Sequence, residues 1–368
     1  MNDSERRVSS GEAWAEFCDA LKQAGEQIQR PEAPSDPFTR AEGYRYLSRL
    51  ARAGLEWYLE FNDPAFPVLY VPSHETIKIG ADNPDNLYQK AVLDGRHEYR
   101  IRGRRGTVYY LSFLTSKGSY AENSRQTETG FLDGEQLQLE PDGSFEIIVS
   151  SRKHAGNWLP MEPETIALLV RQTFMDRKAE TPAELTIERL DRGATPEPLT
   201  AEQLETGLRT AASFVNNTAR LFADWSQSYL PRPNELPPAD QKLCHAVGGD
   251  QNIFYYHGYF ELAEDEALVI EVERIPECRA WNLQADNYWM ESLDYRYHCI
   301  HVNKHTARHR PDGSVRIILA HRDPGLDNWL DTAGHRNGTL CFRWIASREI
   351  VHPTSRVVKF AELKNLPK

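Results

Sequence analysis

One internal repeat constrains the fold of this chain more than any other feature of its sequence. The pattern of residues 142–174 recurs, in the same order, at residues 312–344. The shared parts are an Asp-Gly-Ser turn, an apolar run, an arginine, an Asn-Trp-Leu step and a second arginine: 142–144, 147–149, Arg152, 157–159 and Arg171 in the first copy, and 312–314, 317–319, Arg322, 328–330 and Arg343 in the second. Glycine supplies the positive φ of a tight turn, and the β-branched run after it suits a strand. The repeat therefore predicts two β-modules related by duplication.

Short strand-like segments surround both copies of the repeat. At 268–273 three apolar residues alternate with residues of the opposite face, the pattern of a sheet with one buried side. Other candidate strands are 107–113, 145–151, 165–174, 254–262, 287–292, 297–305, 314–321 and 338–345, with an edge strand or extended arm after Pro353. Strands this short, with no helices between them, favour sandwiches. We predict a mainly β fold with α additions, in which two tandem antiparallel β-sandwich or jelly-roll-like modules are wrapped by helices.

Helical apolar spacing marks four segments: 10–29, 37–62, 83–93 and 201–229. Asp36 is the expected cap of the second segment, and Thr200 with Gln203 is the expected cap of the fourth. The Pro-rich stretch 231–238 breaks the chain after that helix. The predicted organisation is an N-terminal helical region at 1–94, a first β-module at 95–190, a linker and long helix at 191–249, and a second β-module with the candidate site at 250–368.

Charge and composition exclude several classes of partner. The 368 residues carry a net charge of -11, which repels nucleic acid and anionic lipid. The N-terminus lacks the apolar core of a signal peptide, and no run is long enough to cross a bilayer, so we expect a cytoplasmic protein that binds neither nucleic acid nor membrane. Five widely spaced cysteines without a C-x-x-C pair indicate free thiols. The sequence leaves the oligomeric state open, a homodimer included.

Several longer motifs resemble a known family. They are NKHTA at 303–307 with the segment 320–344, preceded by RAEGYRYLSRLARAGLEWYLE at 40–60 and YRIRGRRGTVYYLSF at 99–113. Together they are similar to the bacterial proteins that carry the domain of unknown function DUF1214, across residues 40–345. The resemblance implies a β-sandwich or jelly-roll architecture and implies no established activity.

The second copy of the repeat has gained ionisable residues. Where the first copy has 150–153 as Ser-Ser-Arg-Lys, the second has 320–323 as Ala-His-Arg-Asp, and its loop adds Asp331 and His335. Imidazole can give and take a proton near neutral pH, and a neighbouring carboxylate can orient it. The candidate catalytic residues are therefore His321, His305, Asp323, Asp331 and His335. The alternative is that these residues only satisfy backbone groups of a long Gly-rich loop.

A second set of residues could bind a ligand. If 295–305 is one strand, its alternate residues from Tyr295 to His305 share a face that is polar enough to line a pocket. The candidate ligand-binding residues are Arg322, Asn303, His301, Tyr297, Tyr288 and Asp286, with Trp289 beside them. A lining of Tyr and Trp suits a largely apolar ligand with a few oxygens. The alternative places the tyrosines in the core and the histidines in solvent.

Other sites have weaker support from the sequence. No H-x-H pair is present, and strand residues four apart lie about 13 Å from each other, so a metal would need ligands from separate strands, for instance His301, His321 and His335. We therefore assign no metal site and no cofactor, although a metal ion stays an alternative. Three arginines at 100, 102 and 104 share a strand face and could hold an anion, or could lie in solvent.

Two functions are consistent with these residues. The first is a cofactor-independent acid–base enzyme, such as a lyase, hydratase, isomerase or hydrolase, acting on a small, mostly apolar oxygenated molecule. In that case His321 and His305 are acid and base, Asp323 or Asp331 orients them, and Arg322 anchors an anion. The second is a non-catalytic protein that binds a small molecule in the same pocket, since such folds support both activities. A metal-dependent enzyme with a histidine site is a further alternative.

Overall fold

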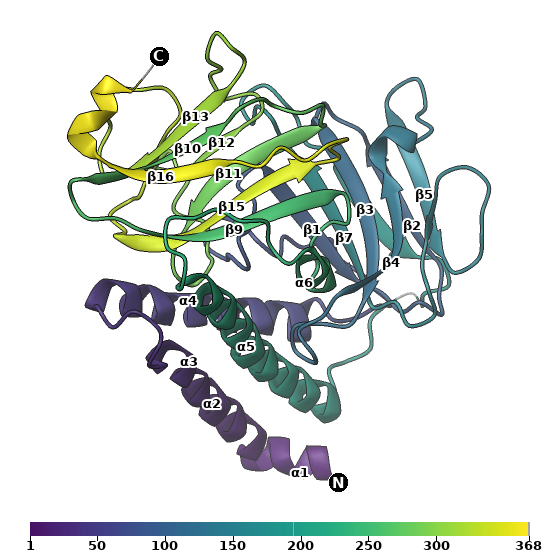
Figure 1. Ribbon diagram of the computed structural model, residues 1–368. Coiled ribbons are helices and arrows are strands. Elements are labelled where there is room, and N and C mark those ends of the chain that lie inside the picture. Colours follow the sequence, from purple (N-terminus) through teal and green to yellow (C-terminus); the bar gives the residue numbers. More distant parts are fainter. Residues whose placement is uncertain (194, 367–368) are drawn as a thin grey trace. The chain divides into compact units, whose positions relative to one another are not determined.

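A computed structural model describes residues 1–193 and 195–366 (Figure 1). The chain divides into two compact units, and each is described by itself. The first unit contains Met1–Arg30, Leu47–Ile77 and Asp85–Arg220, and the second contains Pro31–Tyr46, Lys78–Pro84 and the residues from Leu221 onward. Residues of the expected helical region 1–94 thus belong to both units.

The first unit contains a β-sandwich of two four-stranded sheets. One sheet has the order β1-β7-β3-β4, with β1 Asn86–Val92, β7 Ala167–Thr173, β3 Tyr110–Lys117 and β4 Thr127–Asp133. The other has the order β6-β5-β2-β8, with β6 Trp158–Pro160, β5 Ser144–Ser150, β2 Tyr99–Arg104 and β8 Glu184–Arg189. Apolar side chains from both sheets, among them Phe113 and Ile147, form one buried cluster. Alternation along each strand places these residues on the inner faces, as the strand-like sequence pattern requires.

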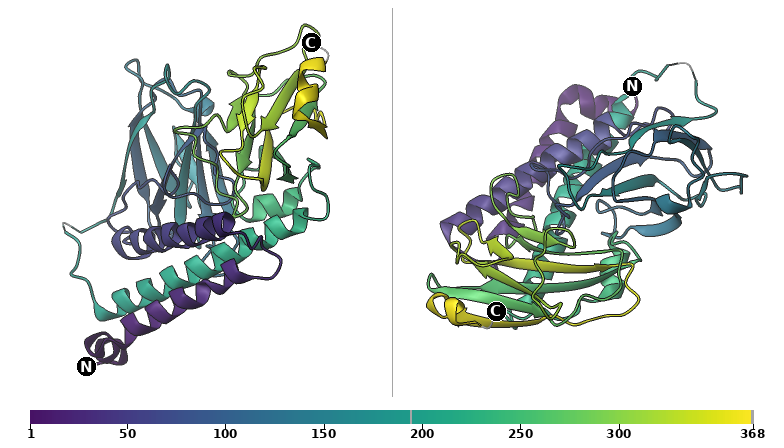
Figure 2. Two further views of the ribbon diagram at one scale, coloured as in Figure 1. Left: turned by 90° about the vertical axis from the view of Figure 1, so that its left-hand side faces the viewer. Right: turned by 90° about the horizontal axis from the view of Figure 1, so that it is seen from above.

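The second unit repeats this plan strand for strand. One sheet has the order β12-β11-β15-β9, with β12 His301–Asn303, β11 Ala280–Asp286, β15 Asn337–Ile345 and β9 Ile253–Glu261. The other has the order β14-β13-β10-β16, with β14 Trp329–Asp331, β13 Val315–Ala320, β10 Glu266–Val272 and β16 Thr354–Lys359. The two sheets form the layers visible in green and yellow in Figure 2, around a core that includes Trp281, Phe342 and Ile317.

The duplication predicted from the sequence is confirmed by this topology. Strands β1 to β8 correspond in order and pairing to β9 to β16, and the fold is mainly β with tandem sandwich modules and helical additions. The pairing is antiparallel except for one short parallel pair in each module, β5 with β6 and β13 with β14. As expected for an edge strand, β16 lies at the end of its sheet.

The Asn-Trp step has the same role in both copies. The Asn157 amide donates to the carbonyls of Gln138 and Glu146, at 2.9 and 3.0 Å, and the Asn328 amide likewise bridges two carbonyls, both at 2.8 Å. The next residue, Trp158 or Trp329, donates its indole N–H to a carbonyl at the end of the neighbouring strand. Both tryptophans are half-buried, and Trp329 packs against the apolar cluster that contains Val269 and Ile318.

The helices follow most of the predicted segments. They are α1 Asp3–Ser10, α2 Glu12–Ala24, α3 Glu26–Gln29, α4 Pro37–Leu55 with the π-helical turn η1 Glu56–Glu60, α5 Ala201–Tyr229 and α6 Gln241–Ala246, with short turns η2 Gly134–Gln136 and η3 Phe360–Asn365. Thr200 and Gln203 form the expected reciprocal cap of α5. In the first unit α2 packs along α5 through Phe17 and Leu208 (Figure 2). None of the helices in the described part of the chain is long and apolar enough to cross a membrane.

The predicted helix at 83–93 is wrong, because that segment forms strand β1. All seven residues of β1 pair with β7, and Ala91 is buried in the sandwich core. Seven residues with mixed spacing carry a weak helical preference. Sheet pairing and the burial of one face, both long-range effects, outweigh it.

Two predicted strands in the second module are also wrong. Residues 287–292 form a buried turn in which the Asn287 side chain accepts the backbone N–H groups of Trp289 and Glu291. Residues 295–298 form a turn begun by Asp294, whose side chain accepts the N–H of Arg296, so only His301–Asn303 of the expected strand 295–305 is extended. In both places a side chain accepts hydrogen bonds from nearby backbone N–H groups, which takes the place of hydrogen bonds to a neighbouring strand.

Candidate functional site

One sheet of the second module carries an ordered array of polar side chains on the side that faces away from its apolar core. In register across β11, β15 and β9, the rows are Asn282, Arg343 and Tyr255, then Gln284, Cys341 and His257, then Asp286, Thr339 and Tyr259. Strand β12 extends the first two rows with Asn303 and His301. We call these eleven residues the polar face.

The polar face is buried. All of its members except the half-buried His301 are less than 9% exposed. The segment 81–83 covers part of it and bonds to its side chains. Asn282 donates to the Asn83 side chain at 2.6 Å, and Gln284 donates to the Asp82 carbonyl at 2.9 Å. Buried polar groups of this kind are stable only when they are hydrogen-bonded, so the array behaves as one network.

Arg343 is the hub of this network. Its guanidinium donates to the side-chain oxygens of Asn282 and Gln284, at 3.2 and 2.6 Å, and to the carbonyl of Ala81. Gln284 links Arg343 to Asp286, because its amide nitrogen also donates to Oδ1 of Asp286 at 2.6 Å. The arginine thereby fixes which way the Gln284 amide points, and the amide in turn positions the carboxyl group of Asp286.

Asp286 supplies the carboxyl group of the polar face, and its pKa is strongly shifted. Burial, helped by the nearby carboxyl of Asp82 and opposed by the hydrogen bond from Gln284, raises its pKa to about 8. The group is therefore neutral at pH 7 and can donate a hydrogen bond. Its Oδ2 atom is buried and has no hydrogen-bond partner among residues 1–193 and 195–366.

A buried lysine and a second aspartate lie at the edge of the polar face. The Lys78 ammonium donates to the carbonyls of Ser292 and Leu293, at 2.5 and 2.8 Å. Asp82 accepts the backbone N–H and the hydroxyl of Ser292, and burial raises its pKa although the charge of Lys78 opposes the shift. Because two carboxyl groups share this region, ionisation of one disfavours ionisation of the other.

The same face of the first module has a different composition. Register places Ser112, Leu114 and Ser116 at the positions of Asn282, Gln284 and Asp286. On the next two strands, Leu169 corresponds to Cys341, and Lys90 and Val92 correspond to His257 and Tyr259. The arginine and one tyrosine are kept, as Arg171 and Tyr88. Most of the polar array is thus specific to the second module.

A second buried pair lies outside the polar face. His335 Nε2 lies 2.6 Å from the Glu42 carboxylate, and its Nδ1 lies 2.8 Å from the carbonyl of Thr332. Burial opposes the charged forms, but the mutual hydrogen bond and attraction outweigh it, so the pKa of Glu42 is lowered and that of His335 is raised. The pair thus favours the protonated form of His335, in which both ring N–H groups are bonded, an arrangement that orients the 332–335 loop.

His321 is joined to the same loop. Its Nδ1 lies 2.8 Å from the Thr332 hydroxyl and its Nε2 lies 3.3 Å from the Leu262 carbonyl. Both ring nitrogens are therefore engaged by the protein. Thr332 links His321 to His335, so the structure brings together two of the five candidate catalytic residues.

The other three candidate catalytic residues have other hydrogen-bond partners. Asp331 accepts from His298, with Nδ1 at 2.7 Å, and caps the turn at Ala333. Asp323 is exposed and accepts the N–H of Gly325, and His305 is an exposed residue of the turn after β12.

Of the six candidate ligand-binding residues, three belong to the polar face: Asp286, His301 and Asn303. Tyr288 follows Asp286 in the buried turn, and its ring meets that of Tyr259 edge-on at 6.4 Å. Tyr297 is 78% exposed, and Arg322 is an exposed residue stacked on Phe360 at 4.3 Å. Neither of these two lies on the polar face.

The structure does not gather the histidines into a metal site. In the part of the chain that is described, no group of three or more His, Cys, Asp or Glu side chains could hold a metal ion. His301, His321 and His335 therefore do not form the ligand set considered from the sequence.

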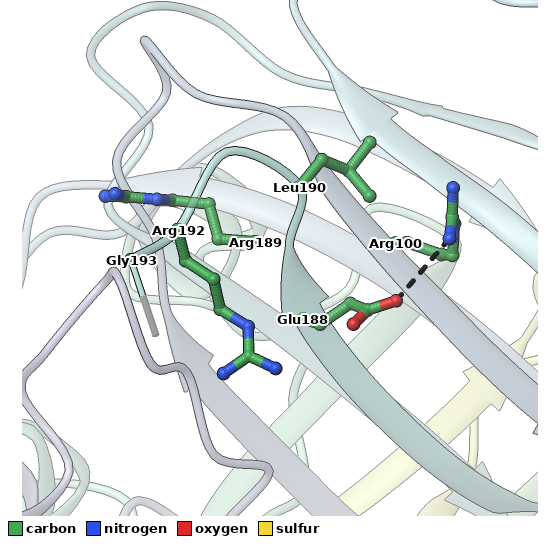
Figure 3. A pocket seen from close by; sticks show the side chains of 6 residues that line it. All are labelled: Arg100, Glu188, Arg189, Leu190, Arg192 and Gly193. Atoms are coloured by element: carbon green, nitrogen blue, oxygen red, sulfur yellow. Dashed lines mark ion pairs between the residues drawn. The ribbon is translucent and has the colours of Figure 1, made fainter. Parts of the chain in front are cut away.

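A pocket of about 680 Å³ lies on the first module and is lined by Arg100, Glu188, Arg189, Leu190, Arg192 and Gly193 (Figure 3). Arg100 lies 3.5 Å from Glu188, the ion pair drawn there, and 3.2 Å from Glu146. Arg189 pairs with Asp191 at 3.0 Å. Carboxylates of the protein thus neutralise two of the three arginines, which weakens the pocket as an anion site.

Several residues of the polar network and of the Glu42–His335 pair were not predicted from the sequence. Gln284 and Arg343 belong to the alternating patterns of β11 and β15, so the polar residues at every second position of 280–286 were a usable signal. Glu42, Lys78 and Asp82 come from segments about 200 to 290 residues away from their partners. No local pattern could have linked them to this site.

Comparison with known proteins supports the architecture. The family model described as "Protein of unknown function (DUF1214)" matches residues 85–173 and 261–349, one match in each module. A crystal structure of a putative uncharacterized protein from Burkholderia cenocepacia is 60% identical, with a TM-score of 0.96, over 97% of this chain and 99% of that one. The VPA0106 protein from Vibrio parahaemolyticus is 13% identical with a TM-score of 0.46, over 86% of this chain and 98% of that one. A search of curated proteins found no match. The two matched segments and their common strand order lead to one conclusion: the chain belongs to the DUF1214 family and carries its domain twice.

Proposed function

We propose that the second module binds a small, mostly apolar oxygenated molecule on its polar face, with Asp286 as the group that recognises the ligand oxygen. The observation that carries this proposal is the buried Oδ2 atom of Asp286, for which the described residues offer no hydrogen-bond partner. Native proteins pair nearly all buried polar side-chain atoms, so an exception of this kind favours a partner from outside the chain.

The chemistry of the ligand follows from the protonation of Asp286. With its pKa raised to about 8 by burial, the carboxyl group is neutral at pH 7 and donates through one oxygen. Its partner is therefore an acceptor, such as a carbonyl, ether or hydroxyl oxygen. The buried rings of Tyr259 and Tyr288 supply apolar surface beside it, which suits a ligand whose remaining surface is apolar.

The internal repeat supplies the variant that tests this proposal. Asp286→Ser introduces the residue of the equivalent first-module position, Ser116, which is itself buried. A thermal-shift screen of small ketones, lactones, ethers and alcohols is run on the wild type and the variant. We expect compounds that raise the Tm of the wild type and lose most of that shift with Asp286→Ser.

Ser116→Ala is the control at the matched position and should keep every ligand-induced shift. Circular dichroism establishes that both variants are folded. The proposal fails if the shifts persist in Asp286→Ser, or if no compound in the screen gives a shift that depends on Asp286.

The raised pKa of Asp286 favours a second function, acid–base catalysis. A general acid works best when its pKa lies near the working pH, and a carboxyl at about 8 keeps its proton at neutrality. In this proposal Asp286 protonates the ligand oxygen, in place of the histidines considered from the sequence. Compounds that bind are incubated with the protein and followed by NMR. Turnover that is lost in Asp286→Ser and falls as pH rises through about 8 supports catalysis, while unchanged compounds support binding alone.

A further inference from the structure

The first module has a lysine at the position of His257, and its surroundings are unusual for a lysine. Lys90 lies in β1 opposite Leu169, as His257 lies opposite Cys341. It is half-buried, and its Nζ lies over the Trp57 ring at 5.4 Å from the centroid. Among the residues that the structure describes, Lys90 Nζ has neither an ion pair nor a hydrogen bond. Lysines are normally exposed or paired with an acid.

The Trp57 ring beside this amine belongs to an aromatic cluster. Trp57 is 6% exposed and packs on Tyr70 and Phe214, with ring centroids at 6.0 and 4.9 Å. The backbone of Tyr70 bonds to that of Lys90 in both directions, which holds its segment against the strand. Tyr70 and Tyr58 are titratable members of this cluster, and burial raises the pKa of both, so they stay neutral.

A second donor in the same cluster also lacks a partner. The indole Nε1 of Trp57 is buried and finds no acceptor within residues 1–193 and 195–366. The cluster therefore contains an amine and an N–H group, both donors, beside apolar ring surface. The ligand that suits it is apolar and carries an acceptor oxygen.

We propose that Lys90 is a reactive amine that binds a small apolar aldehyde or ketone as an imine, with the carbonyl oxygen first accepting a hydrogen bond from Trp57 Nε1. The neutral amine attacks the carbonyl carbon and forms a carbinolamine. Loss of that oxygen and two protons as water leaves the C=N bond, so no oxidant or reductant is needed. Desolvated lysines in apolar sites are suited to this chemistry.

The protonation of Lys90 supports the step. Burial lowers its pKa to about 8, with no charged group among the causes. At pH 7 about one-tenth of such an amine is neutral, against roughly one part in 2,500 for a lysine with the ordinary pKa of about 10.4. Even with hindered access and lower intrinsic nucleophilicity, Lys90 should react faster than a solvent-exposed lysine.

The test is reductive trapping on the full chain with benzaldehyde and sodium cyanoborohydride, followed by peptide mass spectrometry. Lys153, which is exposed on the same module, is the internal reference. We expect Lys90 to be labelled at least about ten times faster than Lys153 at pH 7, with its rate levelling off near pH 8. Equal or slower labelling of Lys90 overturns the proposal.

Two variants separate the parts of the proposal. Trp57→Phe keeps the ring and removes the N–H, so the labelling rate of Lys90 should fall several-fold while that of Lys153 is unchanged. Lys90→Met keeps a long unbranched side chain but removes the amine, so it should remove the fast-labelled site without creating another. An unchanged Lys90 rate in Trp57→Phe would overturn the assigned role of the indole.

Discussion

The sheets β1-β7-β3-β4 and β9-β15-β11-β12 have the same strand order and the same pairing, yet their outer faces differ in chemistry. In the second, Gln284 and Asp286 join Arg343 in a buried network. In the first, Leu114 and Ser116 occupy the equivalent positions. The first module therefore shows that this sandwich forms without the full polar array.

The difference matters because a buried polar network is difficult to maintain. Each member must be desolvated and paired, and an apolar residue of similar volume is often at least as stabilising. The second module keeps such a network and leaves one carboxyl oxygen, Oδ2 of Asp286, without a partner in the described chain. On the proposal above, that oxygen separates a ligand-binding face from scaffold, and five predictions test the distinction.

The largest effect is expected for Arg343→Met, since it removes the donor to Asn282, Gln284 and the Ala81 carbonyl. Leaving these buried acceptors unpaired should cost roughly 3 to 5 kcal/mol in urea unfolding. Arg171→Met, the matched change in the first module, should cost less, because Leu114 there has no acceptor to lose. Equal costs would show that the arginine has one scaffold role in both modules.

The next effect concerns Asp286 and depends on pH. Its pKa is about 8 in the folded protein and about 3.9 in an unfolded chain. Between these values the folded state holds one more proton, so stability falls by about 1.4 kcal/mol per pH unit as pH rises. Asp286→Asn removes this slope and should stabilise the protein at pH 8 by on the order of 2 to 4 kcal/mol, with a smaller gain at pH 5. Parallel pH profiles of wild type and variant would mean that the carboxyl is ionised in the folded state.

Trp158→Ala and Trp329→Ala test two positions that have equivalent structural roles in the two modules. Both tryptophans pair at the same register and donate to equivalent carbonyls, so each change should cost roughly 2 to 3 kcal/mol, less than for a fully buried tryptophan. The two costs should agree within about 1 kcal/mol. Loss of ligand-induced Tm shifts in Trp329→Ala alone would assign this tryptophan to the site.

Glu42→Gln tests the buried pair that Glu42 forms with His335. The lowered pKa of Glu42 gives stability that is lost below its usual 4.5, and the raised pKa of His335 gives stability that is fully present below 6.5 and lost at higher pH. The substitution should therefore cost about 2 kcal/mol at pH 6 and less at pH 9. A cost that does not change with pH would show that the pair is not an ion pair.

The smallest effect is expected for His321→Ser, which introduces the residue of the first copy, Ser151. Loss of the hydrogen bonds to Thr332 and Leu262 should cost about 1 kcal/mol, because water can reach the half-buried site. Ligand-induced Tm shifts that depend on Asp286 should be unaffected. If those shifts disappear while the unfolding curve is unchanged, His321 belongs to the functional site after all.

Much of the fold could be predicted from the sequence, because its signals are local. The repeat of Asp-Gly turns, apolar runs and Asn-Trp steps identified the two modules, and helical spacing with the Thr200 cap identified α5. Strand β1 was missed, since seven residues of mixed spacing are assigned by pairing with β7 rather than by their own pattern. The segments 287–292 and 295–298 were assigned to strands but form turns.

The site depended on contacts that no local pattern contains. Asp286, His301 and Asn303 were predicted from the sequence as ligand-binding residues. The expected strand 295–305, which contained the last two, is mostly turn. Glu42 reaches His335 across 293 residues, and segment 81–83 covers strands 200 residues away. Burial, which decides the protonation of Asp286 and Lys90, is a property of the surroundings that folding creates. The repeat and many of its strands are visible in the amino-acid sequence, because hydrophobic periodicity relates near neighbours. Which polar groups are desolvated together could not be predicted in this way, because desolvation depends on segments that meet after folding.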